Sequence, residues 1–260
     1  MCIRDRIYRL PVMMKRNWLQ QCTELRDEPI ADLPVFNLIT PRSACTQCEH
    51  KLSALENIPI ISYLFLRGRC SQCQTRISLC YPLVETVTAL MSGFVAWYYG
   101  YALITIAVLI FVWALIALAV IDINTQLLPD DITLPLLWIG LLVNMNNGFT
   151  DIQSAIIGAV AGYLSLWSIY WCFKLLTGKE GMGYGDFKLL SAIGAWLGWS
   201  MLPLVILFSS LVGAIAGIGL MLTAKLNKSI PIPFGPYLVG GALIALFWGK
   251  KLNHAYFGLF

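Results

Sequence analysis

The uncharged, apolar stretch from Tyr101 to Ile121 constrains the fold more strongly than any other part of this sequence. A helix of about 20 apolar residues spans the hydrocarbon core of a bilayer, and a backbone in that core has to satisfy its hydrogen bonds internally. Further apolar runs occupy residues 83–99, 134–143, 152–173, 187–199, 202–224 and 234–248. The run 187–199 is short for a span and either crosses with help from its neighbours or re-enters. The sequence therefore predicts an all-α polytopic membrane protein with six to seven transmembrane helices.

Composition and charge agree with a membrane protein. Hydrophobic residues make up 58% of the 260-residue chain and charged residues 12%, whereas soluble domains carry about 25% charged residues. The net charge of +4 does not indicate nucleic-acid binding, because the basic residues form no stripe along an element. Lys174, Lys179 and Lys188 fall in or beside one loop between apolar runs. Because lysine and arginine are in excess in cytoplasmic loops, we expect this loop to face the cytoplasm.

Residues 1–81 differ in composition from the rest of the chain. Proline, arginine, asparagine and cysteine are spread through them, and no uncharged apolar stretch reaches the length of a membrane span. We expect residues 1–81 to form a small cytoplasmic domain and residues 82–260 to form the transmembrane domain. Residues 1–6 are unrelated in character to the residues after them, which leads us to expect a truncated or mis-assembled start.

Two Cys-x-x-Cys pairs organise the polar domain. Thiols stay reduced in the cytoplasm, and two thiolate pairs can close a tetrahedral site of the kind that holds structural zinc. Such a site stabilises a domain that is too small for a large core. A redox dithiol and unrelated free thiols are the alternatives, and His50 is expected at the surface because four sulfurs already satisfy the metal. The predicted zinc ligands are Cys45, Cys48, Cys70 and Cys73.

A carboxylate stands at the end of each of two apolar runs. Asp122 directly follows residues 101–121, and Asp186 lies in the stretch Gly181–Lys188. The alternation of loops across the membrane puts both at the cytoplasmic face. Two carboxyl groups close together share one proton, so one can activate water as a general base while the other protonates the scissile carbonyl oxygen. The pair predicts an aspartyl peptidase that works without a covalent intermediate.

Other roles stay open for the acidic residues. In the first alternative, Asp186 only caps the helix that follows it, and Asp122 only ends the helix that precedes it. Asp130 and Asp131 fit capping better than catalysis, while Glu85 fits either a first-turn acid or a site residue. A proton-coupled transporter would use Asp122 and Asp186 as a proton relay, although both lie at one face and no inverted repeat is visible. A zinc-stapled scaffold without catalysis is the third alternative.

Glycines mark two places where close approach is expected. Gly213 and Gly217 form a G-x-x-x-G pattern, which permits close packing of membrane helices. Gly181, Gly183 and Gly185 precede Asp186 at alternate positions. Because glycine has no side chain, we expect these three residues to let backbone or an extended substrate approach the carboxylate.

An ordered series of motifs runs along nearly the whole chain. It consists of Ile7-Tyr8-Arg9-Leu10-Pro11, Asn37-Leu38-Ile39-Thr40-Pro41-Arg42-Ser43, both Cys-x-x-Cys pairs, Glu56-Asn57-Ile58-Pro59, Arg67-Gly68-Arg69-Cys70, Tyr81-Pro82-Leu83-Val84-Glu85, Asp122 with Leu128-Pro129-Asp130, the stretch Gly181–Lys188, and Pro233-Phe234-Gly235-Pro236. In this order the motifs resemble those of the type IV prepilin leader peptidases, a family of bifunctional membrane enzymes.

The resemblance implies a GxGD-type aspartyl endopeptidase of the bacterial inner membrane, with Asp122 and Asp186 as the catalytic pair facing the cytoplasm. Its substrates would be the precursors of type IV pilins and type II secretion pseudopilins, which have a short basic leader and are cut after a glycine just before a hydrophobic helix. The family's second activity methylates the new N-terminal amine with S-adenosylmethionine, and the tetracysteine zinc domain is linked to it. The sequence assigns no residue to S-adenosylmethionine and leaves the oligomeric state open. Family members also carry a further membrane helix ahead of the Ile7–Pro11 motif, which the resemblance leads us to expect is missing here.

Overall fold

The computed structural model describes residues 3–26, 37, 44, 45, 47, 48, 50–53, 56, 58, 61–179, 181–224 and 233–257. Regular structure in these ranges is helical, and strand pairing is limited to two isolated bridges. The predicted all-α class is confirmed. The chain divides into two compact units, residues 1–109 and 110–260. The domain boundary expected after residue 81 rests on composition and stays a prediction.

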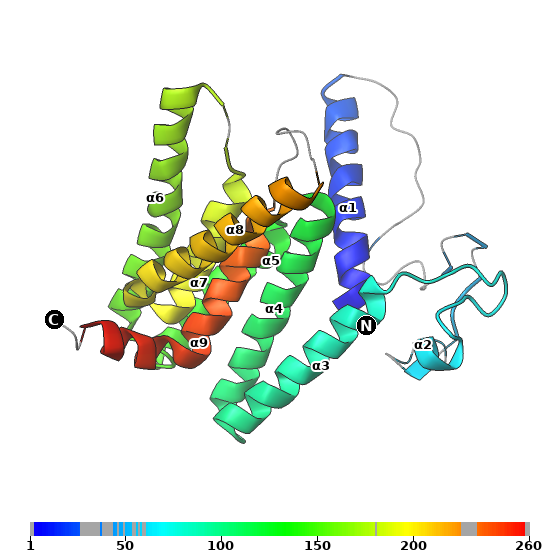
Figure 1. Ribbon diagram of the computed structural model, residues 1–260, viewed down its shortest axis with the longest axis horizontal. Helices are drawn as coiled ribbons and strands as arrows, with labels where there is room; N and C mark the ends of the chain where they lie inside the picture. The colour runs from blue at the N-terminus through cyan, green and yellow to red at the C-terminus, as the bar shows by residue number, and fades with distance from the viewer. Residues whose placement is uncertain are drawn as a thin grey trace. The chain divides into compact units, whose positions relative to one another are not determined.

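The amino-terminal unit contains α1 (Ile3–Glu24), α2 (Ile61–Phe65) and α3 (Cys80–Tyr99), which Figure 1 labels. Sequence reasoning did not predict α1, which packs against α3 and has Pro11 inside it. Helix α3 ends at Gly100, between the two apolar runs, where the φ of +66° is a conformation that glycine adopts readily.

The apolar runs form a series of helices in the order predicted. They are α4 (Leu103–Thr125), α5 (Asp130–Met145), α6 (Ile152–Thr177), α7 (Tyr184–Leu197), α8 (Leu202–Ala224) and α9 (Gly235–Phe257), with a short 3-10 turn at Trp199–Met201. In the described ranges, three stretches are by themselves long and apolar enough to cross a bilayer: Leu103–Thr125, Ile152–Thr177 and Trp199–Gly219. The chain is therefore a polytopic membrane protein.

The end of α4 differs from the expectation. The helix continues past Ile121, so Asp122 lies in its last turn and not after its end. Asn124 and Thr125 do not interrupt the helix, because their side chains donate to the backbone carbonyls four residues earlier. The turn ends at Gln126, whose φ is +54°.

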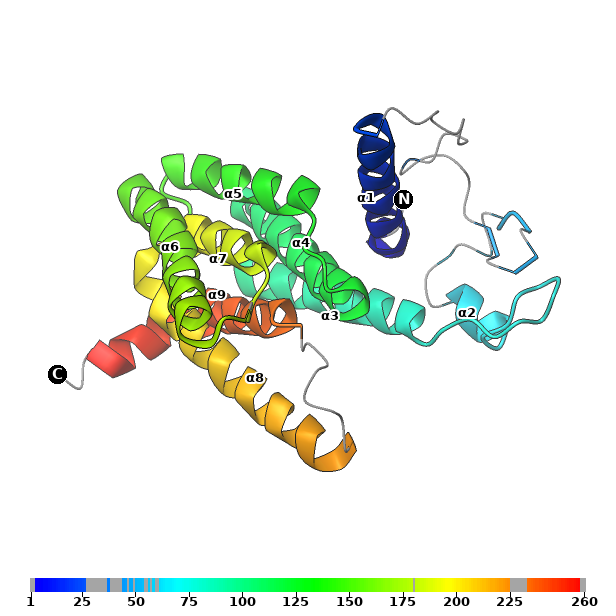
Figure 2. The ribbon, with the colours of Figure 1, turned by 90° about the horizontal axis from the view of Figure 1, so that it is seen from above.

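Helix α7 forms the centre of the carboxyl-terminal unit. From Asp186 to Leu197, every residue except Lys188 is buried. Helices α5, α6, α8 and α9 all contact α7, and Figure 2 shows it between α6 and α9. A helix that is apolar on nearly all sides belongs in an interior, which explains how this short segment is accommodated.

Glycines allow α6 and α7 to meet backbone to backbone. A Cβ atom on Gly158 would collide with the carbonyl oxygen of Gly194, and a Cβ atom on Gly194 would collide with that of Gly158. A Cβ atom on Gly162 would lie 2.7 Å from the carbonyl oxygen of Leu190. These facing pairs show that α6 and α7 run antiparallel. The close approach therefore lies at Gly158 and Gly162, a G-x-x-x-G pattern that sequence reasoning did not single out.

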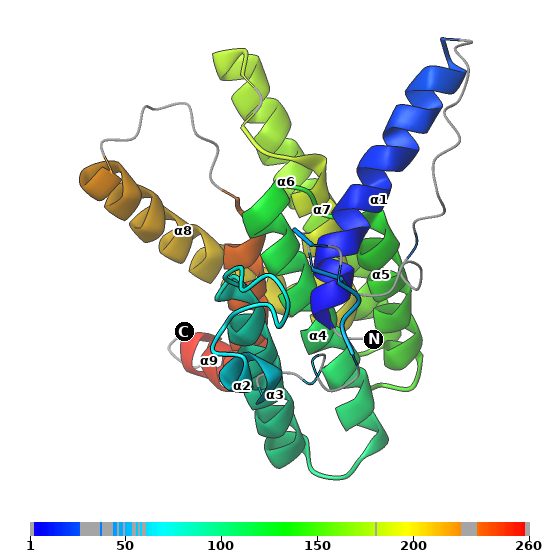
Figure 3. The ribbon, with the colours of Figure 1, turned by 90° about the vertical axis from the view of Figure 1, so that its right-hand side faces the viewer.

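In the G-x-x-x-G pattern of Gly213 and Gly217, which the sequence analysis named, Gly213 packs against a side chain. The nearest atoms to a Cβ on Gly213 belong to the ring of Tyr237 in α9, at 3.3 Å. A side chain, and not a neighbouring backbone, packs there. Closer to the start of α8, a Cβ on Gly241 would lie 2.7 Å from the carbonyl oxygen of Val205, and Figure 3 shows the far end of α8 diverging from α9.

Two buried polar groups tie α5 to the end of α7. The indole N–H of Trp196 donates to the carbonyl of Leu136 at 2.8 Å. The side-chain amide of Asn144 donates to the carbonyls of Ala195 and Trp196 at 2.8 and 3.0 Å, while its oxygen accepts two N–H groups of the following loop. Asn144 thereby satisfies carbonyl groups that the last turn of a helix leaves without a helical partner.

Candidate active site and metal centre

Asp122 and Asp186 come together in the carboxyl-terminal unit. Asp122, in the last turn of α4, is 5% exposed, and Asp186, in the first turn of α7, is 7% exposed. Their carboxyl groups are close enough to interact electrostatically. Since two neighbouring buried carboxyl groups cannot both ionise without a large cost, the arrangement suits a pair that shares one proton.

One oxygen of Asp122 is held by a backbone amide from a distant part of the chain. The N–H of Gly235 donates to Oδ2 of Asp122 at 2.9 Å, in a buried position. Gly235 is the first residue of α9, and the N-terminus of a helix favours negative charge. Sequence reasoning placed Gly235 in a motif but gave it no role, because a backbone donor leaves no mark in the sequence.

The two carboxyl oxygens of Asp186 differ in their hydrogen bonding within the part of the chain that the structure describes. Gly183 precedes the first residue of α7, and its backbone hydrogen-bonds the Asp186 carboxyl group, as in a capping box. The other oxygen, Oδ1, is buried and has no hydrogen-bond partner among the residues that the structure describes. Helix capping therefore accounts for only half of this side chain.

The glycines before Asp186 accommodate the protein's own side chains. A Cβ on Gly185 would lie 2.7 Å from Cβ of Leu128, and one on Gly181 would lie 2.8 Å from the ring of Phe173. Around Gly183 the nearest atom is Oδ2 of Asp186 at 3.8 Å. Internal packing explains why Gly181 and Gly185 are glycines. The expected approach of a substrate to the backbone therefore stays a prediction for Gly183.

The remaining acids occupy different places. Asp130, in the first turn of α5, binds Lys188 through both carboxylate oxygens, and Asp131 is exposed in the same turn. Asp151 caps α6 by accepting the N–H of Ser154 at 2.9 Å. Glu85 belongs to α3 of the amino-terminal unit, and Glu180 lies outside the described residues.

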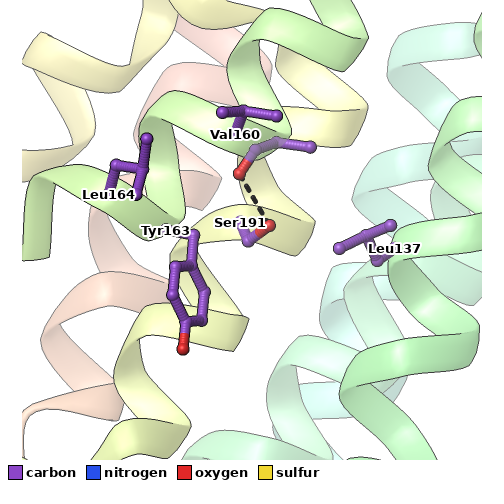
Figure 4. Close-up of a pocket in the computed structure, with 6 residues that line it drawn as sticks. Leu137, Val160, Tyr163, Leu164 and Ser191 are labelled. Atoms are coloured by element: carbon purple, nitrogen blue, oxygen red, sulfur yellow. Dashed lines mark hydrogen bonds between the residues drawn. The ribbon is translucent and has the colours of Figure 1, made fainter. Parts of the chain in front are cut away.

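An apolar groove lies between α5, α6 and α7, with a volume of about 370 Å³. Figure 4 shows that the hydroxyl of Ser191 is turned to the carbonyl of Ala159, to which it donates at 2.7 Å. Neither aspartate lines the groove, so the groove is separate from the candidate active site. Its lining residues are Leu137, Ala159, Val160, Tyr163, Leu164 and Ser191.

The four predicted zinc ligands gather in the amino-terminal unit. Their sulfur atoms all lie within 4.8 Å of one another, with Cys45 and Cys73 at 3.7 Å and Cys48 and Cys70 at 3.9 Å. These separations exceed the ~2.05 Å of a disulfide. Four thiolates ~2.3 Å from a tetrahedral zinc ion would be about 3.8 Å apart, so the donor set fits zinc.

Each Cys-x-x-Cys pair sits in a hairpin of the same design. The N–H of Cys45 donates to the carbonyl of His50, and the N–H of Cys70 donates to that of Thr75, each at 2.9 Å. Isolated bridges close the hairpins at Ala44–Lys51 and Arg69–Arg76. The sequence predicted the ligands but not this repeated backbone frame, which aims two sulfurs from each hairpin at one point.

Thr75 lies beside Cys73, the second cysteine of the second pair. Its hydroxyl lies 3.2 Å from Sγ of Cys73 and donates to Oε1 of Gln47 in the other hairpin at 2.9 Å. The Thr75 side chain therefore connects Cys73 in the second hairpin to Gln47 in the first.

Glu56 links the two hairpins from the side. Hydrogen bonds from the side chain of Ser71 and from Ser53 lower the pKa of Glu56 to about 2, and the Ser53 N–H lies 2.8 Å from its Oε2. The same oxygen is 3.5 Å from Nε2 of His50. His50, which was expected at the surface, is partly exposed and lies beside Glu56.

Comparisons with known proteins identify relatives across almost the whole chain. Residues 109–218 match the family model of the type IV leader peptidase family, and residues 5–99 match that of the bacterial peptidase A24 N-terminal domain. A prepilin leader peptidase/N-methyltransferase of Aeromonas hydrophila is 55% identical over 252 residues, covering 96% of this chain and 87% of the relative. Proteins of the same name from Stutzerimonas stutzeri and Pseudomonas aeruginosa are each 51% identical over 251 residues, with the same coverage. No solved structure gives a significant match. The chain belongs to the type IV leader peptidase family.

Proposed function

We propose that this protein is a membrane-embedded aspartyl endopeptidase that removes the short basic leader from type IV prepilins and type II secretion pseudopilins. The observation that carries the proposal is the buried pair of Asp122 and Asp186, in which one carboxylate oxygen has no partner among the described residues. The prepilin leader peptidase name of the relatives supports the choice of substrate.

The surroundings of the two carboxyl groups favour different tasks. Gly235 donates to Asp122, and a hydrogen bond to a carboxylate stabilises its charged form. We assign Asp122 the general base, which takes a proton from water. Oδ1 of Asp186 has no donor among the described residues, and a buried anion without one is costly. We assign Asp186 the shared proton and the role of general acid.

Hydrolysis then proceeds in two steps. Asp122 accepts a proton as water oxygen bonds to the scissile carbonyl carbon, while Asp186 gives its proton to the carbonyl oxygen. The tetrahedral diol collapses when a hydroxyl proton returns to Asp186, the C–N bond breaks, and the leaving nitrogen takes the proton held by Asp122. Both carboxyl groups regain their starting forms, and no bond to the protein is made.

We infer a structural zinc ion at Cys45, Cys48, Cys70 and Cys73, because their sulfur separations suit a closed tetrahedral site. When bound, zinc would join the two hairpins through one sulfur pair from each. A closed four-sulfur site has no open position for substrate, so the zinc would stabilise the amino-terminal unit and take no part in peptide hydrolysis.

Methyl transfer to the new N-terminal amine is proposed from the N-methyltransferase name of the relatives. S-adenosylmethionine would supply the methyl group, and we assign no residue of this chain to its binding. We also place the enzyme in the bacterial inner membrane with its active site towards the cytoplasm. The lysines at the end of α6 and the start of α7, on the side of Asp186, support this orientation through the positive-inside rule.

The proposal is tested with purified protein in detergent and a prepilin whose leader is intact. Wild-type protein should cleave it, while Asp122→Asn and Asp186→Asn should each abolish cleavage. Asp151→Asn is the matched control, because Asp151 caps α6 and asparagine is an equally good cap; it should cleave normally. Cleavage that persists in either active-site variant would refute the proposal, and absence of cleavage in all four proteins would favour the transporter alternative.

A further inference from the structure

The first turn of α9 has a single N–H group suited to holding Asp122. Pro236 has no N–H, and the N–H of Tyr237 donates to the carbonyl of Phe234 at 3.1 Å. The N–H of Gly235 is left over, and Oδ2 of Asp122 accepts it at 2.9 Å. The start of a helix leaves such donors free for an anion, and here Pro236 restricts the choice to one.

Space, and not backbone conformation, is the reason for glycine at this position. The positive-φ glycines in the described residues are Gly68, Gly100, Gly178 and Gly198, and Gly235 is not among them, so alanine could adopt its backbone conformation. A Cβ atom on Gly235, however, would lie 2.6 Å from Oδ2 and 3.4 Å from Cβ of Asp122. The Asp122 carboxylate would have to move away from its donor.

We propose that Gly235 is a positioning residue for peptide hydrolysis: its N–H fixes Oδ2 of Asp122, and its missing side chain admits the carboxylate to that position. The proposal rests on the proposed function, since it takes Asp122 as the general base. With Oδ2 held, the second oxygen of Asp122 is free to take the proton from water. Gly235 itself contacts neither water nor substrate in this scheme.

The kinetic test compares Gly235→Ala with Gly240→Ala. Both substitutions lie in α9, but a Cβ on Gly240 meets no atom of the described residues within 4 Å. Misplacing a catalytic group by about 1 Å can cost on the order of 100-fold in rate. We expect kcat for cleavage of an intact prepilin to fall by about that factor in Gly235→Ala, with KM unchanged, and to keep its wild-type value in Gly240→Ala.

A stability test separates positioning from a general disturbance of α9. Gly235→Ala should lower the melting temperature in detergent, because the new Cβ and the Asp122 carboxylate compete for one space. In an Asp122→Ala background the shift should shrink to less than half, since the carboxylate is gone. Two residues in contact show such coupling, whereas independent sites give additive effects.

The possible results separate the role of Gly235 from the proposed function. If the wild-type protein does not cleave the prepilin, the proposed function is refuted, and the positioning role of Gly235 in hydrolysis is refuted with it. A wild-type kcat in Gly235→Ala, in a preparation whose wild-type protein cleaves, would overturn the role of Gly235 alone. Equal melting shifts in the two backgrounds would also overturn it, because the loss of activity would then come from a distorted helix. A lowered kcat together with a reduced shift supports it.

Discussion

Nζ of Lys188 lies 2.8 and 2.7 Å from the two carboxylate oxygens of Asp130. The contact joins the second turn of α7 to the first turn of α5, near the place where Gly185 packs against Leu128. Both contacts set how the start of α7, and with it Asp186, sits against α5. The acid that sequence reasoning regarded as a helix cap thus holds a neighbouring helix.

Reversal of this ion pair should show that it orients α7. Asp130→Lys and Lys188→Asp should each lower the melting temperature and the rate of prepilin cleavage, because each places like charges together. The double variant should recover most of both losses. The direct energy of such a partly exposed pair is small, about 0–1 kcal/mol, so a double-mutant cycle in detergent is the measurement. Additive effects of the two single changes would contradict this role.

The cysteine cluster should bind about one zinc ion per chain. Elemental analysis of freshly purified, reduced protein should detect it, and Cys45→Ser or Cys70→Ser should lose it, since three thiolates no longer close the site. Cys172→Ser is the control, because Cys172 is an exposed thiol of α6 and should leave the zinc content unchanged. Zinc-free wild-type protein would rule out the metal centre.

The glycine contact between α6 and α7 should be intolerant of a methyl group. Gly194→Ala forces apart two backbones that meet at Gly158, and overpacking of this kind typically costs about 1–3 kcal/mol. We expect a lower melting temperature, together with reduced cleavage because α7 carries Asp186. Gly219→Ala adds a methyl group that has none of the described atoms within 4 Å and should not destabilise the protein. Equal stability of the two variants would show that α6 and α7 do not meet as described.

The depressed pKa of Glu56 predicts a pH dependence that Glu56→Gln should abolish. A carboxyl group with a folded-state pKa of about 2, against an ordinary pKa of 4.5, stabilises the fold fully above pH 4.5. That contribution is lost as the pH falls through about 2. The melting temperatures of wild type and Glu56→Gln should therefore differ above pH 4.5, and the difference should shrink as the pH falls below it. Subtracting the two curves removes any zinc loss common to both, and a difference that does not change down to about pH 2.5 would contradict the assignment.

The helices of the membrane part could be predicted because apolar runs report them directly. Their ends were less predictable, as α4 shows. Asp122 and Asn124 are polar, which suggested an end at Ile121, but polar side chains can remain helical when they bond to the backbone of the preceding turn. Helix α4 ends where Gln126 adopts a left-handed conformation, and a glutamine in the sequence does not predict that conformation.

The candidate site was predictable only as far as its side chains. Charge in the loops placed Asp122 and Asp186 at one face, and spacing grouped the four cysteines. The hydrogen bond from Gly235 joins residues 113 positions apart through a backbone group, which no sequence pattern specifies. Likewise, the sequence contains several G-x-x-x-G patterns, and only the packed structure shows that Gly158 and Gly162, and not Gly213, meet a neighbouring backbone.

Both cysteine hairpins precede α3 in the chain, so a ribosome makes all four cysteines before it makes α3 and the apolar helices that follow it. Domains generally fold as units during synthesis, the amino-terminal one first, and zinc binding is coupled to folding in small metal domains. The proposed zinc site can therefore close before α3 and the helices after it enter the membrane. Shortage of zinc during synthesis would then impair folding of the nascent amino-terminal unit, before the later helices are made.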